Sequence, residues 1–311
     1  MDFRLGIDIG GTNTVLGLVD EYGRIAGKCS VPTLGHCNID DYIDSLAKAC
    51  DSMMPDDGKL LGIGVGAPCA NRETGCIEGA TDLPWHGVVP LANMISKRFG
   101  ASVVISNDAN AAAAGEMMFG AAKGIRNFIM LTLGTGVGGG VVCDGNVLSG
   151  SRGFAGELGH VTLGKGYDRL CSCGRKGCLQ MYCNGRGIVA TALELLADSD
   201  APSSLREIDS EALTAADVMH AARAGDATAL EVYRLTGRVL GEAAANFLAL
   251  SDPEAIVLFG GVAKAGDLLT VPMREAMEEN ALFLYRDRVK ILVSTLPDAD
   301  AAVLGAAALV K

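Results

Sequence analysis

A gapless internal repeat is the feature that most constrains the fold of this chain. Residues 8–20, "DIGGTNTVLGLVD", align with residues 132–144, "TLGTGVGGGVVCD", so that Gly10 matches Gly134. In each segment an apolar run enters a turn of glycine and threonine and a second apolar run leaves it, which is typical of two strands joined by a hairpin. The repeat therefore predicts a duplicated fold with two similar domains that face one another.

The rest of the chain alternates between apolar runs and segments of helical periodicity. Strands are expected at "LLGIGVGAP", "ASVVIS" and "EAIVLFGGVA", and helices at "IDDYIDSLAKACDSMM", "ANAAAAGEMM", "ATALELLAD", "LEVYRLTGRVLGEAAANFLAL" and "VPMREAMEENAL". This alternation predicts α/β layering. We expect an N-terminal α/β domain over residues 1–118, completed by a C-terminal helix at about 300–311, and a C-terminal α/β domain over 119–299.

Composition excludes several classes of function. The chain has 311 residues, of which 49% are hydrophobic and 20% charged, so a folded globular protein is expected. Its net charge is −11 and no window gathers Lys and Arg, which argues against nucleic acid as a partner. The sequence shows no secretory leader and no apolar run long enough for a membrane span. We therefore expect a cytoplasmic protein, with most of its ten cysteines as thiols.

The glycine turns carry the first chemical signal. "GTGVGG" at 134–139 fits a dinucleotide-binding pattern, but β-rich "GVVCDG" follows where that pattern needs a helix, so we exclude a Rossmann site. Glycine lets backbone amides approach an anion closely, and neither turn contains Lys or Arg. Each turn alone could be merely tight, but two matched turns and a third at 259–263, "FGGVA", predict phosphate binding. Mg²⁺ bridging the phosphates would then neutralise most of their negative charge. Asp8 would hold this Mg²⁺ directly or through a water molecule.

The expected phosphate-binding set comprises the residues of these three turns. They are Asp8, Gly10, Gly11, Thr12, Asn13, Thr14, Gly134, Thr135, Gly136, Gly138, Gly260 and Gly261.

A second signal is the spacing H-x10-C-x-C-x4-C in "GHVTLGKGYDRLCSCGRKGC". It is formed by His160, Cys171, Cys173 and Cys178. One histidine and three cysteines can complete a tetrahedral zinc site, and the glycines between them permit a tight loop. Four protein ligands leave no open position, so the loop at 160–178 is expected to hold structural rather than catalytic Zn²⁺. Cys183 lies outside this spacing.

The order of these motifs along the whole chain resembles the ROK family of sugar kinases. The resemblance rests on "DIGGTNT", "NDANAAAAGE", "LGTGVGGG", "GELGH" with its cysteines, and "LFGGVA". It implies the actin-like ATPase fold, with two ribonuclease-H-like domains around a cleft, ATP on the glycine hairpins, and a homodimer. Within the family the chain is most similar to bacterial glucokinases. That similarity implies ATP-dependent phosphorylation of a hexose at its 6-hydroxyl, most simply glucose to glucose 6-phosphate.

The pair "ND" at residues 107–108 offers a proton acceptor. Asp108 follows a predicted strand and precedes a helix, where its carboxylate could take the proton of the attacking hydroxyl or simply cap the helix. The residues alone do not separate these roles. The resemblance favours Asp108 as the general base and implies that Asn107 binds the sugar.

Further sugar contacts follow from the resemblance. It implies that Glu157 and the zinc ligand His160 face the sugar hydroxyls, so that zinc fixes the loop that carries Glu157. Asp82 in "GATDLPWHG" is another candidate, at a position where the family commonly has Asn. Trp85 in the same stretch either contacts the sugar or acts as a wedge between domains.

Gln180 marks a departure from the family. ROK glucokinases commonly read "GCLE" where this sequence reads "GCLQ". The family's glutamate accepts hydrogen bonds from sugar hydroxyls, and an ionised carboxylate accepts them more strongly than an amide. Gln180 therefore either weakens glucose binding and tolerates an N-acetyl substituent, or only packs beside the zinc loop.

The sequence leaves two alternatives to a glucose kinase open. A kinase for an N-acetylhexosamine, such as N-acetylmannosamine or N-acetylglucosamine, or for another hexose would carry the same motifs, because the substrates differ by single substituents. A non-catalytic sugar sensor or regulator of the same family would lack turnover. A DNA-binding module is not expected ahead of the first turn, because only seven residues precede Asp8.

Overall fold

The computed structural model describes residues 1–81 and 83–310 and divides into two compact units. Unit 1 comprises Met1–Arg126, Gly140–Gly156 and Thr295–Lys311, and unit 2 comprises Asn127–Gly139 and Glu157–Ser294. The domain boundary expected at residue 118 stays a prediction.

Unit 1 is built on a five-stranded sheet with the order β3-β2-β1-β4-β8. Its strands are β1 (Asp2–Ile9), β2 (Asn13–Val19), β3 (Ile25–Pro32), β4 (Lys59–Gly66) and β8 (Val103–Ser106). β1 runs antiparallel to β2 and parallel to β4, and β4 runs parallel to β8. The central strand β1 is therefore flanked by a hairpin partner on one side and a crossover partner on the other, and its last residues reach the carboxyl edge of the sheet.

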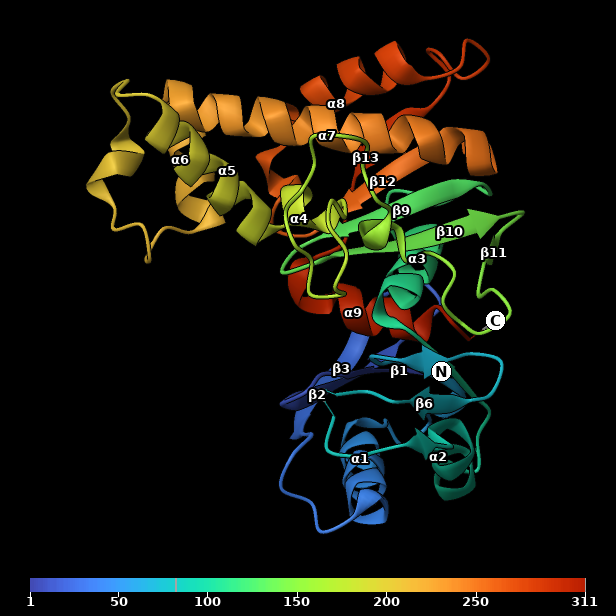
Figure 1. Ribbon diagram of the computed structural model, residues 1–311. Helices are drawn as coiled ribbons and strands as arrows, with labels where there is room; N and C mark the ends of the chain where they lie inside the picture. The colour runs from blue at the N-terminus through green and yellow to red at the C-terminus, as the bar shows by residue number, and fades with distance from the viewer. Residues whose placement is uncertain (82, 311) are drawn as a thin grey trace. The chain divides into compact units, whose positions relative to one another are not determined.

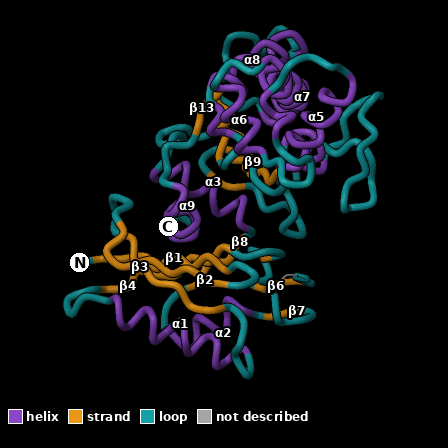
Figure 2. The backbone as a smooth tube through the Cα atoms, turned by 90° about the vertical axis from the view of Figure 1, so that its left-hand side faces the viewer, coloured by secondary structure: helices purple, strands orange, loops and turns teal. Residues whose placement is uncertain are grey.

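Helices cover both faces of this sheet. They are α1 (Ile39–Met53), α2 (Leu91–Phe99), α3 (Asp108–Phe119) and α9 (Asp298–Ala307). Figure 2 shows α1 and α2 on one face, where their apolar sides join the main core, and α9 with α3 on the other. A small sheet of β5 (Ala70–Asn71), β6 (Cys76–Glu78) and β7 (Val88–Val89) lies in the same unit.

Bare glycine backbone lets α9 lie directly on the sheet. A side chain at Gly6 would run into the carbonyl oxygen of Val303, and one at Gly64 into that of Ala306. Helix α9 buries Val303, Leu304 and Ala307 fully or nearly so. A C-terminal helix thus packs on the first sheet, over residues 298–307.

The second sheet repeats the plan of the first, with the order β11-β10-β9-β12-β13. Its strands are β9 (Phe128–Leu133), β10 (Val137–Cys143), β11 (Asn146–Val147), β12 (Ala255–Phe259) and β13 (Lys290–Val293). β9 and β13 both run parallel to β12. The hairpin β9-β10 thus occupies the place in its sheet that β1-β2 occupies in the first, which confirms the duplication predicted from the aligned segments.

The helices of unit 2 form a layer dominated by one long helix. They are α4 (Gln180–Cys183), α5 (Gly185–Asp198), α6 (Ala215–Arg223), α7 (Ala227–Ser251) and α8 (Asp267–Asn280), with short 3-10 turns η1 (Leu158–His160), η2 (Ser204–Glu207) and η3 (Ala263–Ala265). Figure 1 shows α8 alongside α7, and a side chain at Gly241 would run into the Met273 carbonyl oxygen at this contact. Helix α8 begins one turn earlier than the sequence pattern predicts. Among the described residues, no helix is long and apolar enough to cross a membrane.

Candidate active site

The first glycine turn (residues 10–13) joins β1 to β2 and is braced from β3. The Gly10 amide donates to the Asn13 carbonyl at 3.0 Å, and the Thr33 amide donates to the Thr12 carbonyl at 2.9 Å. Thr12 and Asn13 are exposed, and Gly10 and Gly11 are half-buried. The structure therefore forms the tight, accessible turn that the sequence predicts at Gly10 to Asn13.

Thr14 departs from that prediction because its side chain faces the core. It is fully buried, with its Oγ1 at 2.7 Å from the Tyr42 hydroxyl and 2.9 Å from Thr33 Oγ1. Thr33 Oγ1 donates to the Gly10 carbonyl at 2.7 Å, so it accepts from Thr14, which in turn accepts from Tyr42. This buried hydroxyl chain ends on the carbonyl of the turn. Thr14 thus supports the turn and does not offer its hydroxyl to phosphate, which corrects the expected role.

Asp8 and Asp108 lie at the carboxyl edge of the first sheet. Asp8 is the next-to-last residue of β1, and Asp108 opens α3 directly after β8. Burial and, to a lesser degree, the charge of Asp108 raise the pKa of Asp8 to about 6. Among the residues that the structure describes, no basic side chain offsets these two effects on the Asp8 carboxyl. Two carboxylates in this arrangement fit a divalent cation and its water ligands.

The cap of α3 is Asn107 rather than Asp108. The side-chain oxygen of Asn107 accepts from the Asn110 amide at 2.7 Å, while Asp108 Oδ1 accepts from the adjacent Ala109 amide at 2.8 Å. Asp108 is exposed. The alternative that Asp108 serves only as the helix cap is therefore contradicted by the geometry. Because the oxygen of Asn107 is used in the cap, a sugar hydroxyl would meet its amide nitrogen as a donor.

The second glycine turn (residues 134–136) joins β9 to β10 and is held by the residues that start α5. The Gly185 amide donates to the Gly134 carbonyl and Asn184 Nδ2 donates to the Thr135 carbonyl, both at 2.9 Å. Behind the turn, the Gly138 amide donates to Thr132 Oγ1 at 3.1 Å. A side chain at Gly134 would meet no atom of the described residues within 4 Å. The carbonyls of Gly134 and Thr135 are thus fixed from one side, and the backbone at Gly134 is exposed with open space beside it.

A cavity of about 990 Å³ adjoins the second glycine turn within unit 2. Most of its wall is apolar, as in pockets for the base and sugar of a nucleotide. Its lining includes Gly134, Thr135, Gly185, Arg186, Val189, Leu193, Met219, Tyr233, Gly261 and Lys264. The sequence motifs did not point to α5, α6 or the two basic side chains, because amphipathic helices with this spacing look like ordinary core helices.

The third glycine turn (residues 260–262) follows β12. Gly260 has φ +102°, and a side chain there would lie 2.5 Å from the Leu133 carbonyl oxygen. Gly261 lines the cavity, and in the part of the chain that the structure describes no atom lies within 4 Å of the place where its side chain would start. The two glycines therefore differ in role. Gly260 is required by packing against the end of β9, and Gly261 leaves space for a ligand.

The four residues with zinc spacing converge in unit 2. Their ligand atoms, on His160, Cys171, Cys173 and Cys178, all lie within 4.8 Å of one another. His160 Nδ1 lies 3.8 Å from Cys171 Sγ, and Cys173 Sγ lies 3.6 Å from Cys178 Sγ. A tetrahedral zinc ion with bonds of about 2.3 Å to sulfur places neighbouring sulfurs roughly 3.8 Å apart. The cluster therefore fits Zn²⁺ in both donor chemistry and spacing.

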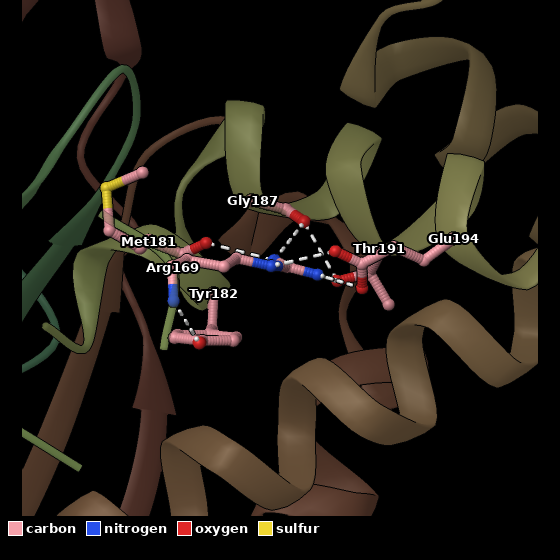
Figure 3. A network of polar contacts seen from close by, with 6 residues as sticks. All are labelled: Arg169, Met181, Tyr182, Gly187, Thr191 and Glu194. Carbon is pink, nitrogen blue, oxygen red and sulfur yellow. Dashed lines mark hydrogen bonds and ion pairs between the residues drawn. The ribbon is translucent and has the colours of Figure 1, made fainter. Parts of the chain in front are cut away.

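Arg169 anchors the cysteine-bearing loop independently of any metal. Its guanidinium donates to the carbonyls of Met181 and Gly187 at 3.0 and 3.1 Å, to Thr191 Oγ1 at 2.9 Å, and to Glu194 at 2.6 Å. The guanidinium also lies over the ring of Tyr182 (Figure 3). The Arg169 side chain is only 14% exposed, so its bonds to the two carbonyls and to Thr191 are largely shielded from water, whereas Glu194 is 61% exposed. They tie the loop to α4 and α5, and α5 is one wall of the cavity.

The other residues that the sequence offers as sugar contacts are Glu157, Trp85, Asp82 and Gln180. Glu157 is exposed and directly precedes η1, which carries His160. Trp85 packs on Tyr42 with ring centroids 4.7 Å apart, which favours a packing role for this side chain. Asp82 lies outside the described residues. Gln180 points its amide nitrogen at Cys171 Sγ, at 3.0 Å, which favours the alternative that it packs beside the zinc loop.

The chain is similar to known proteins over almost its whole length. Residues 4–311 match the sequence profile of the ROK family. The chain is 38% identical to a glucokinase of Halalkalibacterium halodurans, covering 99% of this chain and 94% of the relative. It is 34% identical to a glucokinase of Thermotoga maritima, covering 99% of this chain and 96% of the relative.

A solved structure extends this similarity to the fold. The ROK family glucokinase from Streptomyces griseus, in complex with glucose and AMPPNP, superposes with a TM-score of 0.77 at 31% identity, and 99% of each chain is covered. These matches confirm the resemblance drawn from the motifs. The chain therefore belongs to the ROK family, and its duplicated two-domain α/β architecture is the actin-like ATPase fold.

Proposed function

We propose that this protein is an ATP-dependent hexose kinase that transfers the γ-phosphoryl group to the 6-hydroxyl of glucose. The observation that carries the proposal is the large apolar cavity beside an open glycine turn, in a chain similar over its full length to glucokinases. The structural relative that binds glucose and AMPPNP supports a sugar and an adenine nucleotide as ligands of the same fold.

Asp108 is the proposed general base. Its exposed carboxylate is free of the capping role, and an aspartate that accepts the hydroxyl proton is the standard requirement of phosphoryl transfer to an alcohol. As the O–H bond breaks, the sugar oxygen attacks the γ-phosphorus and ADP leaves. Asn107, Glu157 and His160 are proposed to orient the sugar, and Asp82 stays a candidate for the same role.

The glycine turns are proposed to bind the phosphates of ATP through backbone amides. Mg²⁺ bound with ATP would supply charge neutralisation, and Asp8 would hold it directly or through a water molecule. Arg186 and Lys264 add positive charge at the wall of the cavity, which the motifs alone did not reveal. The adenosine moiety would occupy the apolar cavity between α5 and α6.

The Cys/His cluster is proposed to hold structural Zn²⁺. With three thiolates and one imidazole as ligands, the ion would have no open position for substrate. Its role would be to fix the segment from His160 to Cys178, together with the Arg169 anchor. Metal analysis of the purified protein tests this directly, because substitution of Cys171 by Ser should abolish one equivalent of bound zinc.

A cytoplasmic homodimer is the proposed state. None of the ten cysteines forms a disulfide in the part of the chain that the structure describes, which fits a reducing compartment. Leu282, Phe283 and Leu284 are 51%, 72% and 52% exposed, and three consecutive apolar side chains of this kind suit burial by a second copy. Light scattering of the wild type and of Phe283→Asp should show loss of the dimer in the variant, and a monomeric wild type would contradict the proposal.

A panel of sugars tests the substrate. Coupled measurement of ADP release at fixed ATP should show the highest kcat/KM with glucose, and lower values with mannose, fructose, N-acetylglucosamine and N-acetylmannosamine. Preference for an N-acetylated hexosamine would replace glucose by that class of substrate. Absence of turnover with every sugar, together with retained sugar binding, would favour a sensor.

A further inference from the structure

Gln180 connects two parts of unit 2 that otherwise have separate roles. It is the first residue of α4, two positions after Cys178, and its Nε2 donates to Cys171 Sγ at 3.0 Å. Cys171 is only 3% exposed, so little water reaches the sulfur. Three thiolates and one Zn²⁺ leave the centre with a net charge of about −1, and N–H donors to the sulfurs stabilise that charge.

The other end of the same amide faces the second glycine turn. A side chain built on Gly136 would lie 3.3 Å from Gln180 Oε1, so the two groups are neighbours across a narrow gap. The chain leaving α4 then holds the turn directly, through the Gly185 amide and Asn184 Nδ2. The segment 180–185 thus starts at the cysteine cluster with the first residue of α4, and its last two residues donate to the carbonyls of the turn.

We propose that Gln180 is a positioning residue that couples the zinc centre to the second glycine turn, and hence to nucleotide affinity. Its N–H supports the thiolate of Cys171, and this contact fixes the orientation of α4, which in turn holds the turn through Asn184 and Gly185. The inference rests on the proposed function for the identity of the nucleotide, but its zinc side is independent of catalysis.

The variant Gln180→Glu tests the zinc side. A glutamate has almost the same shape, but its carboxylate cannot donate to sulfur and adds negative charge to a centre that is already negative. Zinc transfer to a chromogenic chelator should be about tenfold faster or more than in the wild type. The matched control is Cys183→Ala, which removes a buried thiol of the same helix that lies outside the cluster and should leave zinc transfer unchanged. Wild-type zinc retention in Gln180→Glu would overturn the proposal.

Calorimetric titration with AMPPNP in the absence of sugar tests the coupling. Gln180→Glu should weaken AMPPNP affinity by about fivefold, as expected when a supporting hydrogen bond is lost. Asn184→Asp keeps the oxygen that caps α5 at the Gly187 amide but loses the donor to the Thr135 carbonyl. It should weaken AMPPNP binding while zinc transfer stays at the wild-type rate.

The outcomes separate this inference from the proposed function. If Gln180→Glu binds AMPPNP normally and instead lowers the KM for glucose, Gln180 is a sugar-selectivity residue and the coupling is wrong. If the wild type binds AMPPNP but does not phosphorylate glucose, the proposed function fails while both binding tests still decide the role of Gln180. If the wild type does not bind AMPPNP, both the nucleotide assignment and the coupling fail.

Discussion

At the scale of single residues, the helix cap that the sequence offered as an alternative role for Asp108 belongs to Asn107. Asn107 caps α3 through its side-chain oxygen, and Asp108 remains exposed one residue later. A strand followed by "ND" and a helix predicts that one of the two caps the helix, but not which one. The cap depends on backbone angles at the strand end, and those are set by tertiary packing.

Substitution of Asp108 tests its role as the proton acceptor. Asp108→Asn should lower kcat by about a hundredfold or more and leave AMPPNP affinity close to that of the wild type, because an amide cannot take the hydroxyl proton. Steady-state kinetics and calorimetry on the same preparation measure both. Near-normal turnover in the variant would remove Asp108 from the chemical step.

Asp8 gives a prediction for stability as a function of pH. Its pKa is raised to about 6 from 3.8, so the native state favours the protonated form. This contribution to stability is fully present below about pH 4 and is lost as the pH rises through 6. Above pH 7 the buried carboxylate therefore costs on the order of 2 kcal/mol, allowing for its partial exposure.

Asp8→Asn should accordingly stabilise the free protein at pH 7.5 by about 2 kcal/mol, and by little or nothing at pH 4. The free energy of unfolding in urea at the two pH values measures the effect. Asp56→Asn, at an exposed position, serves as the control. Equal stability of Asp8→Asn and the wild type at pH 7.5 would contradict the assignment of a buried, uncompensated charge to Asp8.

At the scale of elements, the strands and helices expected from apolar periodicity are present, but their partners were harder to foresee. Segments such as "IDDYIDSLAKACDSMM" carry their own pattern, and α1 covers residues 39–53 as expected. The cavity was not foreseen, because its walls come from α5, α6 and the residues after β12, which are distant in sequence. Thr14 was misjudged for the same reason, since its partners Thr33 and Tyr42 belong to other elements.

Two glycines illustrate how the same residue type serves the fold in one element and a ligand in another. Gly64→Ala should lower the free energy of unfolding by about 2 kcal/mol or more, because the new methyl group meets the Ala306 carbonyl of α9. Gly134→Val should leave stability almost unchanged and weaken AMPPNP binding, because its side chain enters the open space beside the turn. Urea unfolding and calorimetry of both variants check the contrast.

The opposite result for Gly134→Val would contradict the role given to the second glycine turn. If Gly134→Val unfolds more easily but binds AMPPNP normally, the second glycine turn is a packing feature and not a phosphate site. Gly164→Ala is a suitable control, because a methyl group at Gly164 would have none of the described atoms within 4 Å.

At the scale of the whole molecule, two features of the sequence predicted the duplicated sheets and the Cys/His cluster. The aligned turns predicted the duplicated sheets, because a hairpin in the same place of each sheet needs the same glycine positions. The spacing of His160 and the three cysteines predicted their convergence, because four zinc ligands constrain a short loop strongly. The support given by Arg169 and Gln180 had no such signature, since their contacts depend on where α4 and α5 lie.

The proposed reaction of this chain is phosphorylation of glucose at its 6-hydroxyl. The most direct test couples the reaction to glucose-6-phosphate dehydrogenase and follows reduction of NADP⁺, since only the 6-phosphate is oxidised. We expect NADPH formation that requires both ATP and glucose, equals the ADP released, and falls by about a hundredfold or more in Asp108→Asn. Two results would contradict this proposal: glucose-dependent release of ADP from ATP without NADPH formation, or no reaction at all in the wild type.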